Sequence, residues 1–396
     1  MSFCLRKIHG READLPTAFQ TFRIPKRTAV LLILLMLLPL CLLTACGIGE
    51  TKIKTGTGSG AGSINGTGAD AQPTLQKFTA VLPDAFDTTI SVTAMCESQE
   101  RFDELTAVAS GIFEKYHKLF DIYYTYPGIN NLKTINDNAG KEPVAVESEL
   151  LDFLQFAVEV CALTEGNVNI AMGGVLRLWH DAREFGSTYP DLAALPEENA
   201  LREAGKHCSI ENIQIDRAAS TVYLSDPETN IDVGALAKGY TAGLAVKALK
   251  ESGFTHVSLD AGGNICLIGD KGTRDWNVAV TNPDRYSAKA YLGYVSVSDC
   301  AVVTSGAYQR YFAVNGHKYH HIIDKDTLYP EERWQSVTVL YPDSALADAY
   351  STALFNMDAE EGAAFVERTE GLEAMWVDWN YKVSFSPGFE AVYTSA

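Results

Sequence analysis

The sequence predicts an α+β fold. Apolar and polar residues alternate in segments such as 86–95, as in a half-buried strand, and apolar residues recur at helical spacing in segments such as 100–122. The two kinds of segment do not alternate regularly along the chain, so a doubly wound parallel sheet is not expected. With 396 residues, of which 46% are hydrophobic and 21% charged, the chain can form a substantial core.

The N-terminal segment has the features of a secretory leader. Arg23, Lys26 and Arg27 precede the apolar run TAVLLILLMLLPLCLL, which is short for a membrane span. The residues that follow, Leu43-Thr44-Ala45-Cys46, resemble a bacterial lipobox, in which the cysteine carries the lipid. An uncleaved signal anchor is the alternative.

We therefore divide the chain into three parts. Residues 1–45 are expected to form a signal peptide with a lipobox, which makes Cys46 the lipidation site. Residues 46–74 form a flexible tether rich in Gly, Ser and Thr, and residues 75–396 form the globular domain. This arrangement predicts a lipoprotein of the cell membrane, anchored on its extracytoplasmic face.

Charge and cysteine content exclude two classes of function. The chain has 32 Lys and Arg against 50 Asp and Glu, a net charge of −18, which argues against nucleic acid as a partner. After the predicted processing, the widely spaced Cys96, Cys161, Cys208, Cys266 and Cys300 remain, without a C-x-x-C pair. They predict neither a zinc site nor a disulfide framework, and most are expected to be buried.

The elements are expected in a mixed order along the domain. Strands are expected within 75–95, 213–226, 230–234, 256–270 and 275–285. Helices are expected at 100–122, 147–164, 190–206, 235–254 and 345–355. Asn315-Gly316 lies between two β-like runs and predicts a hairpin.

The expected helix ALADAYSTALF, at 345–355, carries an unusual polar patch among its alanines. Asp348, Ser351 and Thr352 are spaced at i, i+3 and i+4, which places a carboxylate and two hydroxyls on one helical face. Taken alone, such hydroxyls are expected to bond back to helix carbonyls, with the carboxylate in solvent.

Three further segments place polar groups or glycines where packing alone does not require them. Asp232–Tyr240 joins a strand end to a helix start beside Lys238, which fits either a phosphate site or an ordinary strand–helix turn. The paired glycines of Asp260–Asn264 indicate a bulge or the close approach of a ligand. His320 and His321 face opposite sides of a strand, so they do not share a metal, and the inward one is either catalytic or an ordinary core histidine.

Together these segments resemble one family, the FAD:protein FMN transferases of the ApbE type. The co-linear motifs that carry the resemblance are FDTTISV, LFDIY, LKTIN, TEGNVNIAMGGVLRLWH, DVGALAKGYTAGLAVKALKESGF, DAGGNICLIG, DWNVAVTNP, VVTSGAYQRYF, YHHIIDKDT and ALADAYSTALF. They cover almost everything from residue 77 onward. The resemblance implies an ApbE-like, T-fold-like arrangement of mixed helices and largely antiparallel sheets, in a single globular unit after the lipoprotein leader.

The resemblance also implies a Mg²⁺ site on the polar patch. The Asp348 carboxylate, the Thr352 hydroxyl and the backbone carbonyl of Ala235 match the ligands of the family, and Ser351 is a weaker candidate within reach. Mg²⁺ prefers about six hard oxygens in octahedral geometry and takes several of them from water and phosphate.

FAD is the implied substrate of the same site. The positions that match flavin contacts of the family are Phe86, Tyr123, Asn167, Val168, Asn169, Asp232, Lys238 and Ile323. Tyr123 aligns with an aromatic residue that stacks on flavin, and the nearby Tyr126 is an alternative for this role.

This chain departs from the family pattern at several positions. Asn169 stands where the family usually has aspartate, Ala171 where it has threonine, and Phe86 where it has methionine. Lys325 and Leu328 replace the proline and glycine of the loop after the histidines. Because leucine takes a positive φ only at a cost, we expect this loop to have a different shape from the family loop.

The implied activity is a Mg²⁺-dependent transfer of the FMN phosphoryl group from FAD to a threonine or serine of another protein, with release of AMP. His321, Asp348 and Lys238 are the catalytic candidates, and the implied acceptor is a redox protein with an S/T-G-A-T/S type of motif. The alternatives are a Mg²⁺-dependent FAD pyrophosphatase giving FMN and AMP, and a flavin-binding lipoprotein without catalysis.

Overall fold

The structure, a computed structural model, describes residues 74–396. The predicted signal peptide, Cys46 and almost all of the tether lie outside the described residues. Within the described part of the chain, no helix combines the length and the apolar character that crossing a membrane requires.

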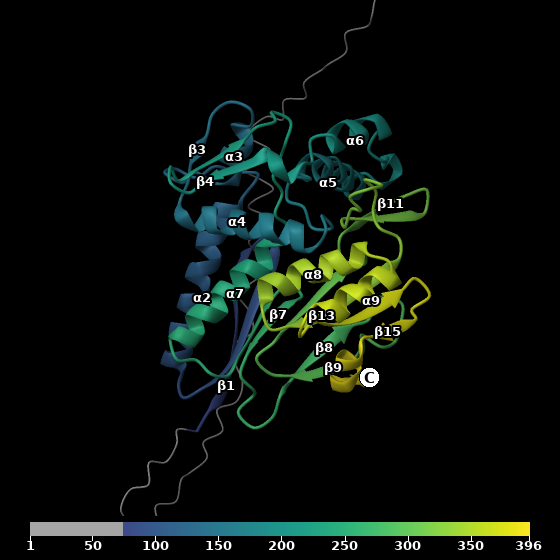
Figure 1. Cartoon of the computed structure of the whole chain (residues 1–396). Coiled ribbons are helices and arrows are strands. Elements are labelled where there is room, and N and C mark those ends of the chain that lie inside the picture. Colours follow the sequence, from purple (N-terminus) through teal and green to yellow (C-terminus); the bar gives the residue numbers. More distant parts are fainter. Residues whose placement is uncertain (1–73) are drawn as a thin grey trace, which may run out of the picture. The chain divides into compact units, whose positions relative to one another are not determined.

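An antiparallel sheet of eight strands forms the centre of the domain (Figure 1). Its strand order is β1-β2-β6-β7-β10-β13-β14-β15, and every neighbouring pair is antiparallel. The strands are β1 (Gln76–Ala85), β2 (Thr88–Cys96), β6 (Val257–Ala261), β7 (Asn264–Ile268), β10 (Ala301–Gly306), β13 (Trp334–Tyr341), β14 (Glu373–Asp378) and β15 (Val383–Phe385). The predicted α+β class with largely antiparallel sheets is confirmed.

Helices cover one face of this sheet (Figure 1). They are α2 (Gln99–Phe120), α7 (Ala237–Glu251) and α8 (Ser344–Asn356), with α9 (Ala359–Arg368) following α8. The alanines of α8 explain its close packing, because Ala347, Ala349 and Ala353 are completely buried. Asp343 caps the first turn of α8 by accepting a hydrogen bond from the Leu346 N–H at 2.9 Å.

A smaller antiparallel sheet covers the opposite face. It consists of β8 (Trp276–Thr281), β9 (Tyr291–Val297) and β16 (Tyr393–Ser395), beside α10 (Pro387–Val392). Val278 and Val295 of this sheet pack against Val302 and Leu340 of the large sheet in a separate apolar cluster. The central strands β10, β13 and β14 are therefore buried on both faces, whereas the edge strand β1 is largely exposed.

The remaining elements lie above α7 and α8 in Figure 1. One group contains α3 (Leu132–Asp137), α4 (Ser148–Leu163) and a sheet of β3 (Val144–Ala145), β5 (Thr221–Leu224) and β4 (Ile213–Asp216). The other contains α5 (Gly173–Thr188), the 3₁₀ turns η1 (Pro190–Leu192) and η2 (Ile210–Asn212), α6 (Glu198–Gly205), and the predicted hairpin β11 (Tyr311–Val314) and β12 (His317–His320).

Three local predictions need correction. The helix expected at 190–206 is divided into η1 and α6, because Pro196 interrupts the helical pattern between them. Residues 230–234 form no strand and contribute only a single bridge from Asn230 to Met172. We did not predict α5, whose paired glycines weaken its helical signal.

Close packing explains the glycine at the start of α5. The Gly173 N–H donates to the Asn230 carbonyl at 2.9 Å. A Cβ at Gly173 would lie 2.4 Å from that carbonyl oxygen, so no larger residue fits at this position. The segment around Asn230 therefore anchors α5 instead of extending a sheet.

Candidate active site

The predicted site residues line one cleft of about 760 Å³. It lies beside α7 and α8 and is bordered by the β1–β2 turn, the segment before α5 and the segment after β12. Apart from the weaker candidate Ser351, every predicted site residue of the described chain is among its lining: Phe86, Tyr123, Asn167, Val168, Asn169, Asp232, Ala235, Lys238, His321, Ile323, Asp348 and Thr352. Segments far apart in the sequence thus converge on one cavity.

The N-terminus of α7 meets Asp348 of α8 at the floor of the cleft. The Gly239 N–H donates to Asp348 Oδ2 at 2.8 Å, and Lys238 Nζ lies 3.9 Å from the same oxygen. A Cβ at Gly239 would lie 2.4 Å from the Cβ of Asp348, so glycine is required for this approach. Burial raises the pKa of the Asp348 carboxyl, and the neighbouring ammonium and amide oppose this rise.

The Ala235 carbonyl and the Thr352 hydroxyl complete the predicted oxygen set. In a regular helix the Gly239 N–H would donate to the Ala235 carbonyl, but here it donates to Asp348. The Ala235 carbonyl therefore accepts no hydrogen bond from the described residues. The Thr352 hydroxyl lies one turn after Asp348 and 3.3 Å from Ser305 Oγ. Ser351 is completely buried and bonds to Ser305 and to the Asp348 carbonyl, so it does not line the cleft.

This donor set fits a hard divalent cation. A carboxylate, a hydroxyl and a carbonyl without a partner are oxygen ligands of the kind that Mg²⁺ prefers. Across residues 74–396, no three His, Cys, Asp or Glu side chains gather as a metal-binding group. The proposed set contains a single carboxylate and so leaves positions for substrate oxygens.

Asp232 and a tight glycine turn form the adjoining wall. Asp232 is partly buried, its Oδ1 accepts the Gly234 N–H at 2.8 Å, and burial raises the pKa of its carboxyl. Gly262 and Gly263, with φ of +67° and +90°, connect β6 and β7 as a hairpin turn. The bulge that we considered at this position is therefore wrong, and both glycines line the cleft.

The two adjacent histidines differ in environment. His320 is buried, its Nε2 donates to the Glu331 carbonyl at 2.6 Å, and its Nδ1 accepts the Ile322 N–H at 3.2 Å. His321 lines the cleft, and its Nδ1 lies 3.3 Å from the Arg310 carbonyl, which can only accept. His321 Nε2 is therefore the unprotonated nitrogen.

Burial lowers the pKa of both imidazoles, of His320 to about 4 and of His321 to about 3. For His321, the nearby His320 and the cations around the cleft add to the effect of burial. Both rings are therefore neutral at physiological pH.

Aromatic and backbone groups line the other end of the cleft. Tyr123 is 41% exposed and its ring centroid lies 5.6 Å from that of His180. Tyr126 also lines the cleft, but its hydroxyl is engaged with Asp121 Oδ2 at 2.7 Å. Phe86 has a φ of +54° and packs against the core, and its N–H donates to His117 Nδ1 at 3.3 Å.

The departures from the family pattern are accommodated locally. Asn169 turns its amide to the protein: Oδ1 accepts the Ala171 N–H at 2.9 Å and Nδ2 donates to the Cys208 carbonyl at 2.8 Å. Leu328 takes a φ of +63°, so the expectation that leucine would avoid this conformation is wrong. Its carbonyl accepts the Trp179 indole N–H at 2.8 Å, and its side chain packs against Gly205.

Sequence reasoning missed a group of cations in the cleft. Arg183 on α5, with a side chain 17% exposed, lies 3.0 Å from His180 Nδ1, and Arg310 donates to the Asp87 carbonyl at 3.2 Å. Both arginines line the cleft with Lys238. The i, i+3 spacing of His180 and Arg183 in WHDAR was the available signal, but it required α5 to be predicted as a helix.

Comparison with known proteins agrees with this site. The model of the ApbE family matches residues 86–376. A FAD:protein FMN transferase of Treponema pallidum (strain Nichols) is 34% identical over 65% of this chain and 73% of its own length. One of Klebsiella pneumoniae (strain 342) is 29% identical over 71% of this chain and 85% of its own length.

Solved structures share the fold. The ApbE protein of Thermotoga maritima matches 80% of this chain and 99% of its own with a TM-score of 0.69 and 28% identity. The flavin transferase ApbE of Vibrio cholerae matches with a TM-score of 0.66 and 24% identity, which supports the fold alone. The family match over most of the domain, the relatives and the shared fold lead to one conclusion: this chain belongs to the ApbE family.

Proposed function

We propose that this protein is a FAD:protein FMN transferase that depends on Mg²⁺. The observation that carries the proposal is the convergence of Asp348, Thr352, Ala235, Lys238 and His321 on one cleft, in a chain of the ApbE family. The curated relatives bear the same activity in their names.

The reaction exchanges the phosphoanhydride bond of FAD for a phosphate ester bond. A hydroxyl oxygen of the acceptor protein forms a bond to the FMN phosphorus of FAD, and the bond from that phosphorus to the bridging oxygen breaks. AMP leaves with the bridging oxygen, and the hydroxyl proton is released. Negative charge therefore increases on the leaving phosphate, and positive groups that surround it lower the barrier.

The chain offers a group for each requirement. Asp348, Thr352 and the Ala235 carbonyl would hold Mg²⁺, which, when bound, neutralises charge on the diphosphate. Lys238 adds a positive charge beside Asp348. Nε2 of His321 is the candidate acceptor for the hydroxyl proton because it is unprotonated and lines the cleft, although its lowered pKa makes it a weak base.

The other wall would hold the flavin portion of FAD. Tyr123 presents an exposed ring for stacking, and Phe86 and Val168 provide apolar contact. Asn167, Asn169, Asp232 and Ile323 contribute polar and backbone groups along the same wall.

Anchoring by a lipid on Cys46 is part of the proposal. The lipobox and the Gly/Ser/Thr-rich tether support attachment to the extracytoplasmic face of the membrane. Acceptors with an S/T-G-A-T/S motif on membrane redox proteins would be reached from this position.

The test is incubation of the protein with FAD, Mg²⁺ and an acceptor carrying such a motif, followed by intact-mass analysis. We expect the mass of the acceptor to increase by one FMN moiety, attached through its phosphate. Release of FMN and AMP without that increment would instead identify a FAD pyrophosphatase, and binding of FAD without turnover would identify a flavin-binding lipoprotein.

Asp348→Ala tests the metal assignment. We expect Mg²⁺-dependent AMP release to fall about 100-fold or more, since the only carboxylate of the metal set is removed. Asp103→Ala, which removes an exposed carboxylate of α2 outside the cleft lining, serves as the control. Unchanged turnover in Asp348→Ala would refute the metal assignment.

A further inference from the structure

Asn356, the last residue of α8, continues the face of the helix that carries the proposed metal ligands. It follows Asp348 and Thr352 at a spacing of four residues, and all of them line the cleft. The side chain is only 5% exposed. Neither the sequence motifs nor the proposed reaction assigns it a role.

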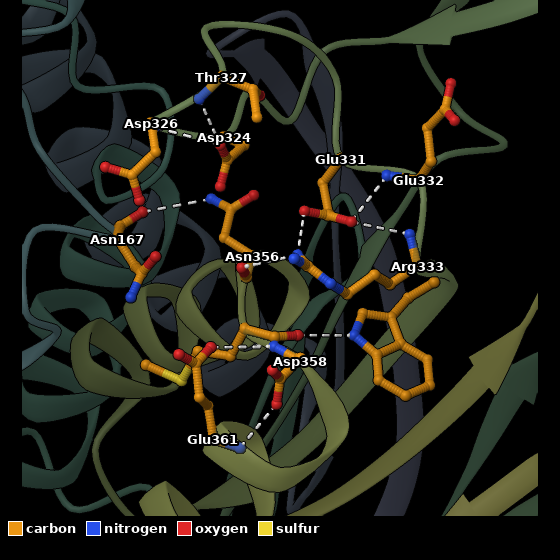
Figure 2. A network of polar contacts seen from close by, with 12 residues as sticks. Asn167, Asp324, Asp326, Thr327, Glu331, Glu332, Arg333, Asn356, Asp358 and Glu361 are labelled. Atoms are coloured by element: carbon orange, nitrogen blue, oxygen red, sulfur yellow. Dashed lines mark hydrogen bonds and ion pairs between the residues drawn. The ribbon is translucent and has the colours of Figure 1, made fainter.

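The amide of Asn356 contacts two separate segments of the cleft wall. Its Nδ2 donates to the Asn167 carbonyl at 3.3 Å and lies 3.5 Å from the Ile323 carbonyl. Figure 2 shows this amide reaching from the end of the helix to Asn167. Both segments belong to the wall where the flavin portion of FAD is expected.

The segment that carries Ile323 is attached to the end of α8 at further points. Arg333 donates to the Asn356 carbonyl at 3.4 Å and pairs with Glu331, as Figure 2 shows. The Glu331 N–H donates to the Ile322 carbonyl at 3.1 Å, and the Glu331 carbonyl accepts from His320. The position of the histidine segment is therefore coupled to the end of the metal-site helix.

The other atom of the amide has no partner. Asn356 Oδ1 is buried and accepts no hydrogen bond from the described residues. Rotating the amide would place this oxygen against two carbonyl oxygens, so the contacts of Nδ2 determine the orientation. A buried oxygen without a partner is destabilising, whereas leucine has a similar volume and avoids this cost.

We infer that Asn356 is a positioning residue, which fixes the Asn167 and Ile323 carbonyls relative to α8. Because α8 carries Asp348 and Thr352, this contact keeps the flavin wall and the metal site oriented toward the same FAD molecule. This inference rests on the proposed function only in taking FAD as the ligand of the cleft. The destabilising amide is retained because it orients the wall rather than because it strengthens the fold.

The first test needs no ligand. Hydrogen exchange of Asn356→Leu should show faster exchange in residues 165–170 and 321–325, and no change in α7. The melting temperature should stay within a few degrees of wild type, because the variant loses two weak hydrogen bonds and also the unpaired oxygen. Unchanged exchange in both segments would overturn the inference.

The second test measures FAD binding by flavin fluorescence in the absence of acceptor. We expect Asn356→Leu to bind FAD about tenfold more weakly, and Asn356→Asp more weakly still, since its carboxylate would face two carbonyl oxygens. Asn212→Leu is the control, because Asn212 donates a similar amide hydrogen bond, to Thr229 at 2.8 Å, away from the cleft lining.

The two proposals fail separately. Wild-type affinity for FAD in Asn356→Leu would overturn the positioning role even if the protein transfers FMN. A loss of FAD affinity in this variant, with wild-type melting, would support the role even if the intact-mass experiment detects no transfer.

Discussion

His320 and His321 differ because their ring nitrogens meet different partners. Both nitrogens of His320 are engaged by backbone groups, one as donor and one as acceptor, so the ring is a fixed neutral part of the core. His321 uses only Nδ1, toward the Arg310 carbonyl, and keeps Nε2 available in the cleft. Alternation along a strand predicted that they face different sides, but their partners lie on segments that the sequence does not place.

Burial of His320 predicts a loss of stability in acid. Its pKa is lowered to about 4 in the folded chain, whereas an unfolded histidine titrates near ~6.5, so the unfolded state binds more protons between these values. The contribution of the neutral His320 ring to the free energy of unfolding is fully present above about pH 6.5. It decreases on acidification, by up to about 1.4 kcal/mol per pH unit. Denaturant unfolding at pH 7 and pH 5 measures it.

His320→Gln isolates this effect from other titrating groups. Glutamine keeps an N–H for the Glu331 carbonyl but does not titrate, so we expect its free energy of unfolding to fall less than that of wild type between pH 7 and pH 5. Equal decreases in the two proteins, or an NMR titration of the His320 ring near pH 6.5, would contradict the expected pKa.

At the scale of elements, α7 and α8 create the metal end of the cleft by their close approach. Predicting α8 required only helical spacing, since alanines and the large apolar residues Leu354 and Phe355 recur along its buried side. Predicting that α7 packs against α8 required knowing that Gly239, which has no Cβ, lies next to Asp348. The missed α5 has the same cause: its glycines serve contacts with Asn230, and these contacts are visible only in three dimensions.

Two glycines of α7 allow a matched test of this packing. Gly239→Ala should lower the free energy of unfolding by about 1–3 kcal/mol and impair Mg²⁺-dependent turnover, because the new methyl group would separate the helices at Asp348. At Gly243, one turn later, a new Cβ would meet Ser344 Cβ at 3.7 Å and the Ala345 nitrogen at 4.0 Å, both at ordinary contact distance, so Gly243→Ala should stabilise the protein by about 0.5–1 kcal/mol. Thermal unfolding and AMP release measure both.

The opposite ranking of these variants, with Gly239→Ala as stable as wild type, would show that the approach of α7 to Asp348 is looser than described. Retained turnover in Gly239→Ala would further show that the Gly239 N–H is dispensable for the orientation of Asp348.

At the scale of the whole molecule, the fold brings three cations of an acidic chain into one cleft, beside four carboxylates. The chain carries −18, yet Arg183, Lys238 and Arg310 come from different elements to line one cleft. Arg310 donates to the Asp87 carbonyl, and Arg183 contacts His180 Nδ1 and lies 3.6 Å from the exposed Glu184 carboxylate. Within residues 74–396, neither arginine pairs with a carboxylate of the cleft lining, so both can contact an anion there. Composition alone did not predict this group of cations, because it carries no information on which residues the fold brings together.

This distribution predicts that Arg183 recognises a phosphate of FAD. Arg183→Gln should weaken binding of FAD and FMN about tenfold and leave riboflavin binding unchanged, because a charge-assisted hydrogen bond contributes about 1.5–3 kcal/mol. Arg177→Gln is the control on the same helix, since Arg177 pairs with Asp181 at 2.9 Å outside the cleft lining. Fluorescence titration at two salt concentrations should show a smaller salt dependence in Arg183→Gln than in wild type. Equal weakening for riboflavin and FAD would instead assign Arg183 to the flavin ring, next to Tyr123 and His180.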